Sequence, residues 1–157
     1  MQSSVQIPKP KGDVCAVIDA NVFVPAIAYT EPECAFYNSA LRKCWKIVIS
    51  DEIRKEYGRV IANYGYRPDV VIHELNKLYA MNKYRESKSD SAAIGDDLAP
   101  RKDRHIVAPC LAQDANVIVT HDRGIHERKN TILSVTGANV LRVNEAQILL
   151  DGSEDCH

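Results

Sequence analysis

Two acidic residues stand where buried strands are expected to end. Asp19 directly follows the apolar run Val14 to Ile18. Asp122 closes the segment Thr120 to Asp122, which follows the apolar run 116–119. Such runs are typical of strands buried on both faces of a parallel sheet, and ligands of these sheets bind at the carboxyl ends of the strands. One such acid could stand there only because polar residues are common where a chain turns after a strand. Two acids in equivalent positions favour a shared site.

Two further acids lie on predicted helices. Glu56 stands three residues after Ile53, and Asp103 stands three residues before Ile106. This spacing places each carboxylate on the apolar side of its helix. Burying a carboxylate costs several kcal/mol unless the group is paired or binds a metal. A salt bridge to arginine would explain either acid alone, whereas the four acids together favour one cleft.

Carboxylates gathered in one cleft repel one another, and a divalent cation relieves this repulsion. Mg²⁺ and Mn²⁺ prefer oxygen ligands, and they convert a bound water into a nucleophile. We therefore predict a hydrolytic metal site whose catalytic and metal-binding residues are Asp19, Glu56, Asp103 and Asp122. The polar segment 82–99 holds more acids, so Asp97 is the alternative to Asp103 as the third ligand.

Basic residues cluster beside these acids, although the net charge is −1 and the pI is about 6.5. Solvated helix faces would explain the clusters equally well. Their position next to the acids instead favours contacts with the phosphates on either side of a scissile bond. The predicted nucleic-acid-binding residues are Arg101, Lys102, Arg104 and Arg123. His105 and His121 also flank the acids, but we interpret them as surface or supporting groups because a metal-activated water needs no histidine.

Strands alternate with helices along the chain, which predicts an α/β domain with a mainly parallel sheet. The expected strands are 14–18, 46–49, 116–119 and 139–143, and the expected helices are 32–43, 51–63, 68–81, 101–114 and 145–150. We predict a loop over 82–99. The predicted organisation is an N-terminal arm over 1–13, one domain over 14–150 and a frayed tail over 151–157.

The composition places the expected domain in the cytoplasm. No apolar run approaches the roughly 20 residues that span a bilayer, and residues 1–13 do not resemble a secretory signal. The five cysteines are odd in number and lack CxxC spacing. We therefore expect reduced thiols packed as small apolar groups, without a disulfide or a zinc site.

Three segments together resemble the PIN domain family. They are VIDANVFV (17–24), SDEIRKEYGRVI (50–61) and KDRHIVAPCLAQDANVIVTHDRGI (102–125). The resemblance implies a three-layer α/β/α sandwich, and it gives supporting roles to Asn21, Ser50 and Thr120 beside the four acids. It also implies Mg²⁺- or Mn²⁺-dependent endoribonuclease activity.

Many small members of this family are VapC-type toxins, so the resemblance leaves open a partner antitoxin, a homodimer or a separate RNA-processing role. Three other functions compete with the nuclease. The first is a non-catalytic PIN domain that binds RNA, although the intact acids argue against it. The second is a phosphatase-like enzyme phosphorylated on Asp19, but Asn21 stands where that chemistry usually has a second acid. The third is a structural module, which leaves Glu56 and Asp103 unexplained.

Overall fold

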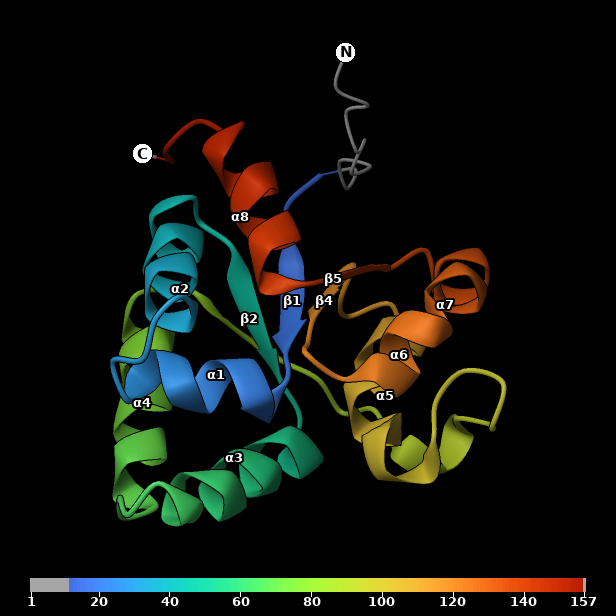
Figure 1. Ribbon diagram of the computed structural model, residues 1–157, viewed down its shortest axis with the longest axis horizontal. Helices are drawn as coiled ribbons and strands as arrows, with labels where there is room; N and C mark the ends of the chain where they lie inside the picture. The colour runs from blue at the N-terminus through green and yellow to red at the C-terminus, as the bar shows by residue number, and fades with distance from the viewer. Residues whose placement is uncertain (1–11, 157) are drawn as a thin grey trace.

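The computed structural model describes residues 12–156, which fold around one parallel sheet (Figure 1). Its strands are β1 (Cys15–Ile18), β2 (Lys46–Ile49), β3 (Tyr84–Glu86), β4 (Val117–Val119) and β5 (Asn139–Leu141). They lie in the order β3-β2-β1-β4-β5, and every neighbouring pair is parallel. The chain therefore builds one half of the sheet outward from β1 and then returns to the other side of β1. The predicted α/β class is confirmed.

Helices cover both faces of this sheet. They are α1 (Ala20–Ile27), α2 (Glu33–Arg42), α3 (Asp51–Asn63), α4 (Asp69–Ala80), α5 (Arg104–Leu111), α6 (Arg123–Glu127), α7 (Lys129–Thr136) and α8 (Val143–Asp151). Connections between parallel strands are right-handed. The connections that contain α1–α4 run from β1 toward β3, and those that contain α5–α7 run toward β5. The two groups of helices therefore pack on opposite faces of the sheet. Figure 1 shows these two groups of helices on either side of β1. The result is the expected three-layer sandwich.

The central strands are buried because both of their faces are covered. The side chains of Ala16, Val17 and Ile18 have no exposed surface. Next to them, the rings of Phe23 and Tyr57 stack with centroids 4.1 Å apart, which joins α1 to α3. The Tyr57 hydroxyl donates a hydrogen bond to the Ile18 carbonyl, so the buried phenol is satisfied. This packing fixes the end of β1, where Asp19 begins.

The structure differs from the sequence prediction at several elements. Strand β3 and a short 3₁₀ turn over Ser91–Ala93 interrupt the loop expected over 82–99. Helices α1, α6 and α7 lie in segments where no helix was predicted. The helix that follows Asp103 begins later than expected, after a 3₁₀ turn over Arg101–Asp103. Among the described residues, no helix combines the length and apolar character needed to cross a bilayer.

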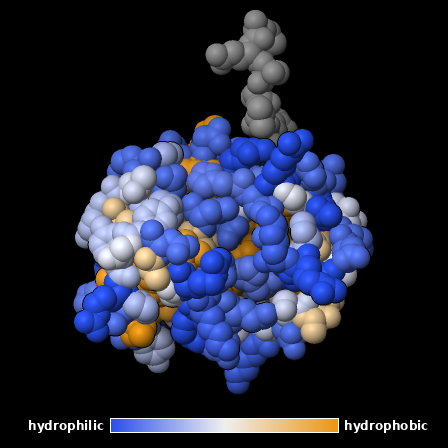
Figure 2. All heavy atoms as spheres, turned by 60° about the horizontal axis from the view of Figure 1, so that its bottom comes forward, coloured by the Kyte–Doolittle hydropathy of each residue, from blue (hydrophilic) through white to orange (hydrophobic). Residues whose placement is uncertain are grey.

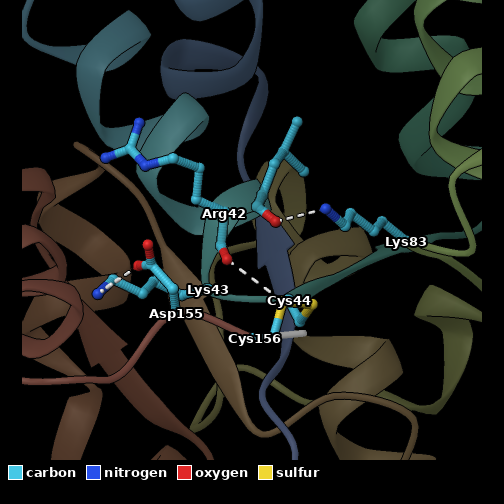
Figure 3. Close-up of a disulfide and its surroundings, with 7 residues drawn as sticks. Arg42, Lys43, Cys44, Lys83, Asp155 and Cys156 are labelled. Atoms are coloured by element: carbon cyan, nitrogen blue, oxygen red, sulfur yellow. Dashed lines mark hydrogen bonds and ion pairs between the residues drawn. A yellow bond between two sulfur atoms is a disulfide. The ribbon is translucent and has the colours of Figure 1, made fainter.

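A disulfide joins Cys44, in the turn between α2 and β2, to Cys156 near the C-terminus (Figure 3). The expectation that all cysteines are reduced is wrong for this pair, while Cys15, Cys34 and Cys110 are free. Spacing along the chain gave no sign of the bond, because the two cysteines are 112 residues apart and meet only in the fold.

The same turn holds the tail by other contacts. Lys43 forms an ion pair with Asp155 at 2.8 Å, and the Cys156 amide donates to the Arg42 carbonyl at 3.4 Å. Residues 152–156, expected to fray, are thus attached to the domain. Most of the predicted N-terminal arm, residues 1–11, lies outside the described residues.

Candidate active site

The carboxyl ends of β1 and β4 form the centre of the candidate site. The two strands are neighbours, with Ile18 opposite Val119, and the Asp19 amide donates to the Val119 carbonyl at 2.9 Å. The strand order reverses between them, which makes this edge the switch point of the sheet. Ligands of open α/β sheets bind in the crevice at such a point. Asp19 and Asp122 are therefore brought to the same place from opposite halves of the chain.

Thr120 joins these two acids. Its hydroxyl donates to Asp19 Oδ2 at 2.6 Å and accepts from the Asp122 amide at 2.9 Å. Thr120 is fully buried, so its side chain has little freedom to turn away. On the outer side, Asn21 Oδ1 accepts from the His121 amide at 3.2 Å. Two of the three predicted supporting residues thus position the loop that carries Asp122.

Ser50, the third of these residues, acts on a helix. Its hydroxyl accepts from the Ile53 amide at 3.1 Å and caps α3, the helix that carries Glu56. This contact satisfies an amide that has no partner within the helix. Ser50 therefore supports the candidate site through the start of α3.

Asp103, at the start of α5, shares its surroundings with the two strand-end acids. Only 8% of its surface is exposed, and its Oδ2 has no hydrogen-bond partner among the described residues. Burial, together with the negative charges of Asp122 and Asp19, raises the pKa of Asp103 to about 6. Burial also raises the pKa of Asp19, against the opposing effects of the Thr120 hydrogen bond and of His105. The structure thus brings three of the four predicted acids together.

Asp122 is the most extensively held of the three. Its Oδ1 accepts from the Ile125 amide at 3.1 Å, which caps α6, and its Oδ2 lies 3.7 Å from Lys102 Nζ. The alternative ligand Asp97 is exposed, in contrast to buried Asp103. Burial and electrostatic coupling therefore favour Asp103 as the third acid.

Glu56 stands apart from the aspartates. It pairs with Arg59 on its own helix at 2.5 Å, and this hydrogen bond is the main reason that the pKa of Glu56 is lowered. None of the hydrogen bonds or ion pairs within residues 12–156 joins Glu56 directly to Asp19, Asp103 or Asp122. A cation that recruits Glu56 must therefore draw it from Arg59.

His105 lies near the site, although from the sequence we interpreted it as a surface or supporting group. Its electrostatic influence lowers the pKa values of both Asp19 and Glu56, so it lies within range of the aspartate cluster and of α3. Its Nε2 is buried and, among the described residues, lacks a hydrogen-bond partner. The one signal in the sequence was its place two residues after Asp103.

The predicted RNA-binding residues occupy different environments. Lys102 is 77% exposed beside Asp122, and Arg101 is exposed next to it. Arg123 is 89% exposed and pairs with Glu127 at 2.9 Å. Arg104 is only 18% exposed and pairs with Asp96. Three of these cations thus face solvent near the acids, whereas Arg104 is committed to a partner within the fold.

Comparison with known families agrees with this arrangement. No curated protein is similar to the chain at a significant level. The model of the PIN domain family matches residues 15–124, more than two thirds of the chain. The matched range runs from β1 through β4 and includes all four predicted acids. The chain therefore belongs to the PIN domain family.

Proposed function

We propose that the protein is a divalent-metal-dependent endoribonuclease with its active site at the carboxyl ends of β1 and β4. PIN domains are generally metal-dependent nucleases. The observation that carries the proposal is the meeting of Asp19, Asp103 and Asp122, two of which have raised pKa values. A fold gains no stability from such mutual repulsion, so the cluster is best explained by a cation that neutralises it.

The donor atoms fit Mg²⁺ or Mn²⁺. Both are hard cations that prefer carboxylate oxygens, and Asp103 Oδ2 is a buried oxygen that accepts no hydrogen bond from the part of the chain that the structure describes. Among residues 12–156, no group of three or more His, Cys, Asp or Glu side chains is placed so that it could hold a metal ion. Mg²⁺ usually keeps several waters and takes only one or two carboxylates directly. One or two of the aspartates, with waters as the other ligands, would suit that mode of binding.

Each residue of the site has a distinct task. When bound, the cation supplies an activated water and charge neutralisation at the scissile phosphate. Asp19, Asp103 and Asp122 would hold it, and Glu56 would join them if it leaves Arg59. Thr120 fixes the Asp19 carboxylate by donating to Oδ2, which keeps its other oxygen available. Lys102 lies close enough to Asp122 to meet a phosphate that approaches this acid.

The substrate class follows from the charges around the cluster. Lys102, Arg101 and Arg123 present exposed cations on either side of a negative centre. Such a rim attracts a polyanion, while the acids exclude its phosphates until a cation is bound. A flexible single strand can bend its backbone toward these acids more readily than a duplex. We therefore propose single-stranded or loop RNA as the substrate.

Cleavage of an unstructured RNA oligonucleotide with Mn²⁺, with Mg²⁺ and with EDTA tests the proposal. Wild-type protein should cleave internally with either metal and not with EDTA. Asp19→Asn should lower the rate on the order of 100-fold or more, because it removes a central ligand charge. Asp69→Asn, an exposed acid at the start of α4, is the matched control and should cleave like wild type. Equal cleavage by Asp19→Asn and wild type would overturn the proposal.

A further inference from the structure

The functional edge of the sheet continues past β4 to β5. Val119 pairs with Leu141, and the Thr120 amide donates to the Leu141 carbonyl at 3.2 Å. Arg142 is the next residue, so it leaves the sheet beside Thr120 at the same edge. Asp19, Thr120 and Arg142 thus follow the carboxyl ends of the neighbouring strands β1, β4 and β5, in that order along one edge of the sheet.

A pocket of about 300 Å³ opens beside this edge. Its lining residues are Arg123, His126, Glu127, Lys129, Arg142 and Glu145. His126 is buried, and its Nε2 lies 2.7 Å from the carbonyl oxygen of Thr120, the residue that holds Asp19. The pocket and the acidic site therefore share the segment 120–126 as a common wall.

The charges of this pocket leave two cations unpaired. Glu127 is neutralised by Arg123 at 2.9 Å, and Glu145 accepts from the Arg142 amide at 2.8 Å. The side chains of Lys129 and Arg142 are exposed, and neither has an ion-pair partner among residues 12–156. The three cations Arg123, Lys129 and Arg142 outnumber the two acids Glu127 and Glu145, so the pocket has a net attraction for an anion.

We propose that this pocket binds a backbone phosphate of single-stranded RNA, next to the phosphate held at the acidic site. The inference rests on the proposed function and extends its substrate path. An RNA strand follows from the position of the pocket, because a chain of phosphates crossing the acids meets Lys129 and Arg142 along the same edge. Arg142 can donate two parallel hydrogen bonds to one phosphate, and Lys129 adds a point charge.

The test measures binding of a fluorescent single-stranded RNA by anisotropy at several salt concentrations, with Ca²⁺ in place of Mg²⁺. Arg142→Gln and Lys129→Gln should each weaken binding several-fold. The slope of log affinity against log salt should fall by about 0.7 for each lost phosphate contact. Arg42→Gln and Lys88→Gln, exposed cations outside this pocket, are the matched controls and should bind like wild type. Arg142→Lys should recover part of the affinity because it keeps the charge.

Other outcomes separate the pocket from the proposed function. If wild type cleaves RNA but Arg142→Gln and Lys129→Gln keep wild-type affinity and salt slope, the pocket proposal fails and the nuclease stands. If the two variants lose affinity although wild type cleaves nothing, the pocket stands and the nuclease fails. If inorganic phosphate binds the pocket but neither substitution changes the affinity for RNA, the pocket binds a free anion and the proposal is overturned. Unchanged melting temperatures would exclude unfolding as the cause of weaker binding.

Discussion

Asp103 carries a large electrostatic penalty in the metal-free protein. Its pKa rises from 3.8 to about 6 through burial and through repulsion by Asp122 and Asp19. The folded state therefore binds a proton more tightly than the unfolded chain does. Stability falls as the pH rises from about 4 to about 6, and the penalty is complete above that range. At neutral pH it amounts to about 3 kcal/mol, since each tenfold change in proton affinity corresponds to ~1.4 kcal/mol.

Asp103→Asn should therefore stabilise the protein when metal is removed. We expect the melting temperature in EDTA at pH 8 to rise by a few degrees, because the substitution removes the penalty. The gain should shrink at pH 4.5, where Asp103 is largely protonated. Saturating Mn²⁺ should narrow or reverse the difference in melting temperature between the variant and wild type, because wild type binds the metal more tightly. Calorimetry under the three conditions checks this, and a variant less stable than wild type in EDTA at pH 8 would contradict it.

At the scale of the elements, buried strands and capped helices could be predicted from the sequence. Strand β2 has its predicted bounds, because the apolar run Ile47 to Ile49 lies between the polar residues Lys46 and Ser50. Helix α3 also has its predicted bounds, because Ser50 supplies a capping oxygen at its start. Strand β3 was missed because Tyr84–Glu86 is a half-exposed edge strand with mixed polarity. Helix α1 was missed because Pro25 usually breaks a helix.

The site was predictable only in part, for a related reason. Positions at strand ends and on helix faces place Asp19, Asp103 and Asp122 in one region. The pairing of Glu56 with Arg59 depends on rotamers that no sequence pattern specifies. The disulfide and the Lys129–Arg142 pocket depend on contacts between segments far apart in the chain. Tertiary contacts of this kind leave no local periodicity.

The cap at the start of α3 gives a prediction at this scale. Ser50→Ala should lower the free energy of unfolding by about 1 kcal/mol, because the Ile53 amide loses its acceptor. Ser50→Asn should restore most of the loss, since its side-chain oxygen can cap the helix. Ser134→Ala, an exposed position within α7, is the control and should not destabilise. Urea unfolding followed by circular dichroism measures all three, and a stable Ser50→Ala would show that the cap contributes little.

At the scale of the whole molecule, the disulfide ties the end of the chain to the turn after α2. Cys44 adopts a left-handed backbone conformation with φ of 61°, where glycine is usual after a helix. A residue with a Cβ is strained there, and its thiol is used in the bond to Cys156. The cross-link closes a loop of more than a hundred residues, which restricts the unfolded chain strongly.

Cys156→Ser should therefore lower the free energy of unfolding by about 2–4 kcal/mol under non-reducing conditions. Both cysteines are exposed, so dithiothreitol should reduce the bond and bring wild type to the stability of the variant. Cys34→Ser, which changes a free thiol, should respond to dithiothreitol as wild type does. Thermal unfolding with and without reductant provides the measurement. If reductant leaves the melting temperature of wild type unchanged, the bond does not stabilise the fold.

The strand order also governs when the active site can exist during biosynthesis. Asp19 is made early, but Thr120 and Asp122, its partners across the β1–β4 junction, are made about a hundred residues later. A nascent chain that ends before β4 can form only the β1–β2–β3 side of the sheet. It lacks the Thr120 hydroxyl that orients Asp19, and it lacks Asp122, the acid that completes the cluster. Under the proposed function, the nascent protein therefore cannot cut RNA until β4 and Asp122 have left the ribosome.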